Sequence, residues 1–108
     1  MKKILLGISL LLLFSAPARG YDSAYFYNLG IDSTMSNIKI NYFTKAIELN
    51  PTLSAAYEKR GMLYYFQERY TEMIRDFLKV TELNPDDAKS YSMLGVAYLK
   101  KDDYDLAV

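Results

Sequence analysis

The chain has 108 residues, enough for one small domain, and its formal net charge is zero. It contains no histidine and no cysteine, which removes the commonest general base, the commonest metal ligands and any disulfide. Three of the 13 basic residues lie in the first 20 positions, which leaves 10 against 13 acidic residues in the rest. This mildly acidic balance argues against a nucleic-acid-binding surface.

Residues 1–20 have the order of a secretory signal peptide. A basic start at Lys2 and Lys3 is followed by an apolar run over 4–14, and small residues around Ala18 and Gly20 offer a cleavage site. The run is shorter than the roughly 20 residues that a membrane helix needs. We therefore predict a bacterial exported chain, periplasmic or secreted, without a stable membrane span after cleavage. The alternatives are an uncleaved anchor or a buried helix.

The rest of the chain predicts a series of short helices. Apolar spacing and turn residues predict helices over 21–32, 38–50, 54–66, about 71–83 and about 87–100, with a sixth beginning at Asp102 or Asp103. Ser36 or Asn37 is expected to cap the second helix and Thr71 the fourth. The carboxylates of Asp86 and Asp87 suit the start of the fifth.

Two helix faces can be predicted in detail. Met73, Phe77 and Val80 form the inner stripe of the fourth helix, whereas Glu72, Arg75, Asp76 and Lys79 are expected to form its solvent-exposed face, with ion pairs three residues apart. In the third helix Gly61 costs about 1 kcal/mol relative to alanine, so we expect it to permit a close helix contact.

Many residues recur after 34 positions, the period of a helix–turn–helix repeat. Tyr57, Gly61, Tyr64 and Tyr70 recur as Tyr91, Gly95, Tyr98 and Tyr104, and Asn50-Pro51 recurs as Asn84-Pro85. This period predicts like surroundings for Tyr57 and Tyr91.

The pattern resembles the tetratricopeptide repeat family. The matching positions are Tyr57, Gly61, Tyr64, Tyr70, Phe77 and Pro85 in one repeat and Tyr91, Leu94, Gly95, Tyr98, Tyr104 and Ala107 in the next. A looser first repeat contains Gly30, Phe43, Ala46 and Pro51. Arg60 stands where the family has leucine, and Lys39 where it has a small residue. The resemblance implies an all-α, right-handed solenoid of antiparallel helix pairs, with repeats over about 21–53, 54–87 and 88–108, the last incomplete.

The resemblance also implies a concave groove, lined by the first helix of each repeat, for a protein or peptide partner. The positions carried over are Tyr27, Ile31, Glu58, Met62, Tyr65, Phe66, Lys89, Ser92, Val96 and Lys100. Some family members hold a peptide's terminal carboxylate in a Lys/Asn/Arg clamp, but Ile31, Met62 and Val96 occupy the asparagine-type positions here, which disfavours that mode. An extended or helical peptide with apolar anchors suits the groove better. The alternative is that Met62, Tyr65 and Phe66 only pack against neighbouring repeats.

The C-terminal end predicts an uncovered face. A sixth helix that stops after one turn would leave Tyr91, Leu94 and Tyr98 without most of their partner, and residues 102–108 would fray. We expect either a fragment of a longer array or coverage by a partner such as a second copy.

These observations predict an exported, non-catalytic interaction scaffold. The sequence shows no phosphate loop, no metal-spaced cluster and no nucleophile–base set, so no cofactor is expected. The alternative is an accessory module of a larger envelope assembly or enzyme, whose active part lies beyond Val108 or on another chain.

Overall fold

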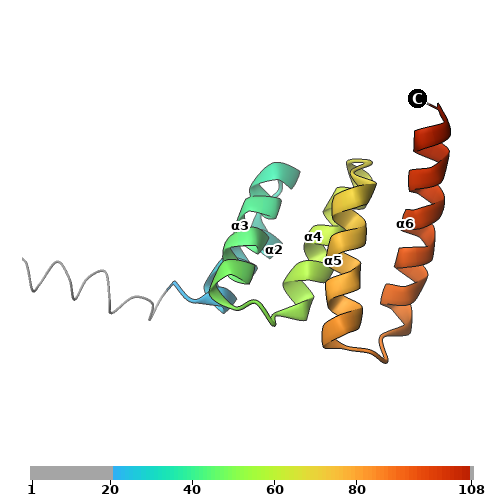
Figure 1. The fold of residues 1–108 in the computed structure, drawn as a ribbon. Coiled ribbons are helices and arrows are strands. Elements are labelled where there is room, and N and C mark those ends of the chain that lie inside the picture. Colours follow the sequence, from blue (N-terminus) through green and yellow to red (C-terminus); the bar gives the residue numbers. More distant parts are fainter. Residues whose placement is uncertain (1–20, 108) are drawn as a thin grey trace, which may run out of the picture.

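A computed structural model describes residues 21–107, and in this part of the chain the regular secondary structure is α-helix alone, with short turns between the helices. The helices are α2 (Ser23–Asp32), α3 (Ser36–Leu49), α4 (Ser54–Phe66), α5 (Tyr70–Leu83) and α6 (Ala88–Ala107). Figure 1 shows α2 behind α3, α4 behind α5 and α6 beyond them, with each helix antiparallel to the one before it in the chain. This arrangement confirms the predicted α-solenoid of helix pairs. The signal-peptide prediction falls on residues 1–20 and lies outside the described residues.

The helix boundaries agree closely with the predicted ones, but two predicted caps are wrong. α3 begins at Ser36, after Met35, and α5 begins at Tyr70; neither helix has a side-chain cap. Ser36, Asn37 and Thr71 therefore lie inside the first turns rather than before them. At α6 the prediction holds, because the Asp87 carboxylate accepts hydrogen bonds from the Ser90 backbone N–H and hydroxyl, at 3.3 and 3.1 Å.

The turn between α4 and α5 uses a left-handed residue. Glu68 has φ of 59°, and its N–H donates to the carbonyl of Tyr65 while the N–H of Arg69 donates to the carbonyl of Tyr64, at 3.0 and 2.8 Å. This pair of hydrogen bonds is a Schellman motif, a place where glycine is usual. The turn therefore reverses the chain with Glu68 in the left-handed region, where a residue with a side chain is strained.

Glycines bring the two helices of each pair into close contact. A Cβ atom built on Gly30 would lie 2.6 Å from the ring of Phe43, and one built on Gly61 would lie 2.8 Å from the ring of Phe77. Since real Cβ atoms do not approach a ring so closely, only glycine permits this helix spacing. The predicted role of Gly61 is thus explained by the buried ring of Phe77 on the facing helix.

The core forms between successive helices in two clusters. One cluster is built from Ile40, Tyr64, Met73, Ile74, Phe77, Leu94 and Ala97, and the other from Phe43, Ala46 and Ala56. The predicted inner stripe of α5 is confirmed, because Met73, Phe77 and Val80 are almost completely buried. Among residues 21–107, no helix is both long enough and apolar enough to cross a membrane.

The predicted exposed face of α5 is wrong at Asp76. Its side chain is only 4% exposed and accepts two hydrogen bonds from Arg60 of α4, at 2.7 and 2.8 Å. Arg60 also donates to the Thr44 hydroxyl at 3.1 Å. Arg60 replaces the leucine of the repeat pattern, and a guanidinium at a buried position requires a carboxylate from the facing helix. Glu72 and Lys79 pair with Arg69 and Glu82 instead.

α6 departs from the prediction by continuing without a break through residue 107. Asp102 and Asp103 do not cap a further helix, and residues 102–107 are helical rather than frayed. This segment lies against the start of α5, where the Tyr104 ring meets that of Tyr70 edge to face at 6.3 Å. An ion pair of 2.8 Å between Lys101 and Asp105, one turn apart, supports the continued helix.

The uncovered face of α6 is confirmed only in part. Tyr91 and Tyr98 are 51% and 48% exposed, but Leu94 is buried against α5. The prediction for Leu94 was wrong because its side chain faces the preceding helix pair. Tyr57, by contrast, is 8% exposed, so the predicted likeness between Tyr57 and Tyr91 does not hold. In the described residues Tyr57 has a following helix to cover it and Tyr91 does not.

Candidate partner-binding groove

The first helices of the three repeats, α2, α4 and α6, present the residues predicted to bind a partner; we call this surface the groove face. α4 and α6 are joined across it by an ion pair of 2.5 Å between Glu58 and Lys89. The hydrogen bond to Glu58 raises the pKa of Lys89 above its usual value. The two predicted residues Glu58 and Lys89 therefore lie together, although 31 positions separate them.

A cavity of about 320 Å³ opens between α2, α3 and α4. Its lining residues are Ile31, Lys39, Phe43, Lys59, Met62 and Leu63. The predicted residues Ile31 and Met62 thus line the same cavity from two neighbouring repeats. The volume lies within the range of sites that bind small ligands or single side chains.

Two lysines, Lys39 and Lys59, line this otherwise apolar cavity, and neither is among the residues predicted to lie in the groove. Lys39 comes from α3 and is half-buried, and its ammonium group donates to the Ile31 carbonyl at 3.4 Å. Lys59 comes from α4 and is exposed. One feature of the sequence indicated a lysine at this cavity: Lys39 stands where the repeat pattern has a small residue. The long aliphatic part of its side chain must therefore run along the space between helix pairs.

The aromatic members of the predicted set differ in their surroundings. Phe66 is 71% exposed at the end of α4 and meets Tyr65 edge to face at 5.4 Å. Tyr65 is half-buried and also lies 6.5 Å from Tyr70. Tyr27 is half-buried and packs on the Phe43 ring at 5.6 Å, which makes it a core residue as much as a groove residue. Phe66 is therefore the aromatic side chain most accessible to a partner.

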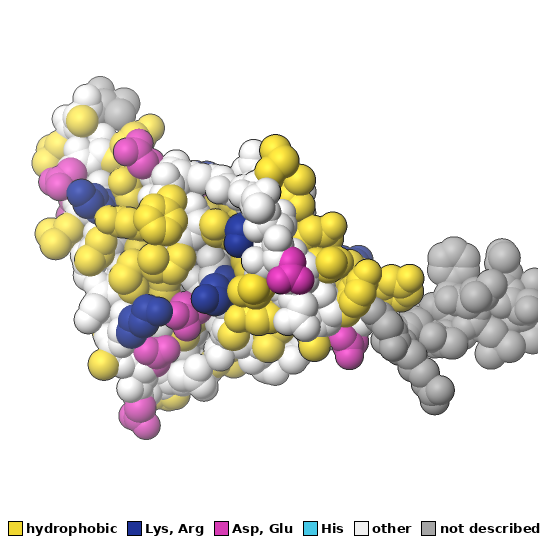
Figure 2. Space-filling model, turned by 180° about the vertical axis from the view of Figure 1, so that it is seen from behind, with side chains coloured by type: hydrophobic (Ala, Val, Ile, Leu, Met, Phe, Trp, Pro, Cys, Tyr) yellow, Lys and Arg dark blue, Asp and Glu magenta, His cyan; other side chains and the backbone are white. Residues whose placement is uncertain are grey.

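The α6 members of the predicted set lie apart from the cavity. Ser92 and Lys100 are exposed, and Val96 is half-buried. None of them lines the cavity between α2, α3 and α4. Figure 2 shows the opposite side of the molecule from Figure 1, the side on which α2 lies. Hydrophobic side chains are spread over this surface, with basic and acidic ones between them.

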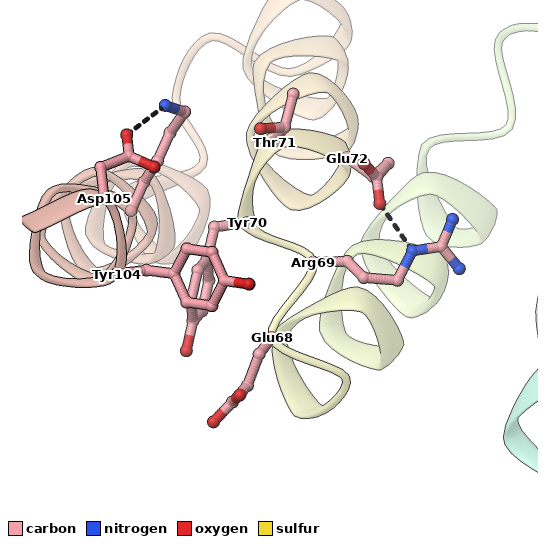
Figure 3. Close-up of a pocket in the computed structure, with 8 residues that line it drawn as sticks. Glu68, Arg69, Tyr70, Thr71, Glu72, Tyr104 and Asp105 are labelled. Carbon is pink, nitrogen blue, oxygen red and sulfur yellow. Dashed lines mark hydrogen bonds and ion pairs between the residues drawn. The ribbon is translucent and has the colours of Figure 1, made fainter. Parts of the chain in front are cut away.

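A second, smaller pocket of about 190 Å³ lies between the α4–α5 turn and the end of α6. Figure 3 shows the Tyr104 ring beside that of Tyr70, at a centroid distance of 6.3 Å. Four of its five charged side chains pair with each other, Arg69 with Glu72 and Lys101 with Asp105, and within residues 21–107 the fifth, Glu68, forms no ion pair. A ligand would therefore meet one uncompensated carboxylate there.

Arg60 and Asp76 form an ion pair of 2.7 Å between α4 and α5, in which the Asp76 side chain is buried. Burial raises the pKa of Asp76, and the hydrogen bonds from Arg60 offset only part of that rise. Burial alone would lower the pKa of Arg60, but the hydrogen bond and charge of Asp76 raise it overall, so the guanidinium stays charged. Within residues 21–107 no group of three acidic side chains is placed to hold a metal ion.

Comparisons with known proteins agree with this architecture. No curated protein sequence matches the chain. Among solved structures it is similar to one titled "Crystal structure of MamA protein", with 26% identity and a TM-score of 0.71. The match covers 82% of this chain and 50% of that one, so the chain spans about half the length of the solved protein.

Family models described as tetratricopeptide repeat match residues 54–87 and 77–108. The two matches together span 54–108, about half of the sequence, and they include the pair α4 and α5 and the following helix α6, where Tyr57, Gly61, Tyr64 and Tyr70 recur after 34 positions. The chain therefore belongs to the tetratricopeptide repeat family.

Proposed function

We propose that this protein is an exported, non-catalytic scaffold that binds a protein or peptide partner through the groove face of α2, α4 and α6. The family and the fold support a role in protein interaction in general. The observation that carries the proposal is the apolar cavity bordered by Ile31 and Met62, two residues that the repeat pattern assigns to partner binding. Exposed Phe66 on α4 adds an aromatic contact on the same helix.

Site-specific photo-cross-linking in the organism of origin tests the groove. A photoreactive phenylalanine analogue at Phe66 should form adducts with a partner protein several times more often than the same analogue at Leu78. Leu78 is the matched control, since it is also a large exposed apolar residue but lies on α5, outside the groove face. Equal cross-linking at both sites, or adducts at Leu78 alone, would contradict groove binding.

Export rests on residues 1–20 and needs its own test. Intact-mass analysis of the protein from its native host should show loss of the first 18 to 20 residues, in accordance with the expected cleavage site. Recovery from the cytosol with Met1 retained would refute export and would leave groove binding untouched.

A second candidate is an accessory module of a larger envelope assembly or enzyme. The half-exposed Tyr91 and Tyr98 favour it, because a partner helix on α6 would bury both rings. Cross-linking from Tyr98 to a second polypeptide, with none from Phe66, would favour this candidate over the groove scaffold.

A further inference from the structure

The cavity between α2, α3 and α4 has a chemistry that narrows the class of partner. Four of its lining side chains, Ile31, Phe43, Met62 and Leu63, are apolar, and the other two are the lysines Lys39 and Lys59. No carboxylate lines it. An occupant must therefore offer an apolar group to the interior and is favoured by negative charge.

The two lysines are available to an incoming anion. Within residues 21–107 neither Lys39 nor Lys59 forms an ion pair; Lys39 only donates to the Ile31 carbonyl, at a long 3.4 Å. The carboxylate next to Lys59 in sequence, Glu58, is held by Lys89 of α6. The Glu58–Lys89 pair therefore leaves the charge of Lys59 uncompensated by its own neighbour.

We propose that the cavity binds an acidic peptide segment of a partner protein, with one apolar side chain inserted between Ile31 and Met62 and its flanking carboxylates paired with Lys39 and Lys59. This inference rests on the proposed groove function and names its ligand class. The volume of about 320 Å³ leaves space for a single large side chain rather than a folded element. The apolar contact supplies affinity, and the two lysines supply selection for acidic sequences.

Methyl NMR on the 108-residue chain provides a local test. With methyl-labelled methionine, Met62 reports on the cavity, and Met93, on α6, is an internal reference outside it. The probes are three short synthetic peptides: a leucine flanked by glutamates, the same peptide with serine for leucine, and a leucine flanked by lysines. Only the first should saturate a shift of Met62 while Met93 stays unchanged.

Charge reversal then tests the role of the lysines. The double variant Lys39→Glu, Lys59→Glu should weaken the glutamate–leucine peptide by about tenfold or more and should strengthen the lysine–leucine peptide. The matched control is Lys45→Glu, a lysine on α3 that lies outside the cavity and forms only an exposed pair with Glu48. This control variant should bind like the unaltered chain. Far-UV circular dichroism verifies that each variant is folded.

The outcomes separate this inference from the proposed function. Equal Met62 shifts with both leucine peptides would overturn the acidic preference but leave the groove as a peptide site. Saturable binding without a Met62 shift would place the ligand elsewhere and overturn the cavity site alone. A Met62 shift that grows with protein concentration, without peptide, would identify a second copy as the occupant and overturn the peptide proposal. Cross-linking from Phe66 in cells decides the groove function independently of these results.

Discussion

Three glycines at equivalent repeat positions provide a matched test of how the helix pairs pack. A Cβ on Gly61 would lie 2.8 Å from one ring carbon of Phe77, 3.1 Å from another and 3.3 Å from the Asp76 Cβ. A Cβ on Gly95 would meet nothing within 4 Å. The same substitution, glycine to alanine, therefore adds the same methyl group to a tight contact in one case and to open space in the other.

The expected stabilities follow from two opposed effects. Alanine is favoured over glycine in a helix by about 1 kcal/mol, and this gain applies to both Gly61→Ala and Gly95→Ala. At Gly61 the new methyl group is 0.6 Å inside the 3.4 Å at which ordinary contact begins, and the Phe77 ring it meets is fully buried and cannot swing aside. Overpacking of this kind costs about 1–3 kcal/mol. We expect Gly95→Ala to stabilise the chain and to exceed Gly61→Ala by about 1–3 kcal/mol.

Urea unfolding followed by circular dichroism measures this difference. With a slope of about 1–3 kcal/mol per molar urea for a small protein, the two midpoints should separate by roughly 1 M. The new Cβ of Gly30→Ala would lie 2.6 Å from the Phe43 ring, so the urea midpoint of this variant should be closer to that of Gly61→Ala than to that of Gly95→Ala. If all three variants shift the midpoint in the same direction by the same amount, the close ring contacts do not explain these glycines.

Three further results are expected from urea unfolding. Asp76→Ala, which removes the carboxylate and both of its hydrogen bonds to Arg60, should cost about 3 kcal/mol, whereas Arg60→Leu combined with Asp76→Leu should cost far less; equal losses would contradict this reasoning. Burial raises the pKa of Asp76, so the folded chain binds a proton at a higher pH than the unfolded chain does, and the stability advantage of the unaltered chain over the non-titrating Asp76→Ala variant should widen as the pH falls from 7 to about 4; an advantage that narrows would show that folding lowers this pKa instead. Glu68→Gly should stabilise by about 1 kcal/mol because it relieves the left-handed turn, and a loss would refute that strain.

The fold could be predicted because its signals are local or periodic. The prolines and the 34-residue recurrence indicate where helices end. The helical spacing of apolar residues predicts the buried stripe of Met73, Phe77 and Val80. The close contact at Gly61 could be predicted too, since an unfavourable glycine in a helix indicates a packing reason. The cavity site could be predicted only for Ile31 and Met62, the two positions carried by the repeat pattern.

The features that were missed depend on contacts between helices. Asp76 follows the polar spacing of α5, and only its partner Arg60, 16 residues earlier on α4, makes its burial possible. The cavity lysines were missed for the same reason. Lys39 departs from the repeat pattern, but Lys59 lies on a different helix, and neither local sequence indicates that the two lysines border the same apolar space. Local pattern assigns a residue to a face of its own helix, whereas charge pairing and cavities are decided by the neighbouring helix.

The contrast between α4 and α6 shows what a following helix adds. Tyr57 and Tyr64 are 8% and 9% exposed, and their counterparts Tyr91 and Tyr98, on a helix with no following partner in the described residues, are 51% and 48% exposed. The proposed binding cavity does not depend on that difference, because every residue that lines it comes from α2, α3 or α4, each packed against a following helix. α6 contributes to the groove face instead through Lys89, which pairs with Glu58 and so leaves the neighbouring Lys59 unpaired. The ligand chemistry of the cavity is thus set by the packed helix pairs, whatever covers the outer face of α6.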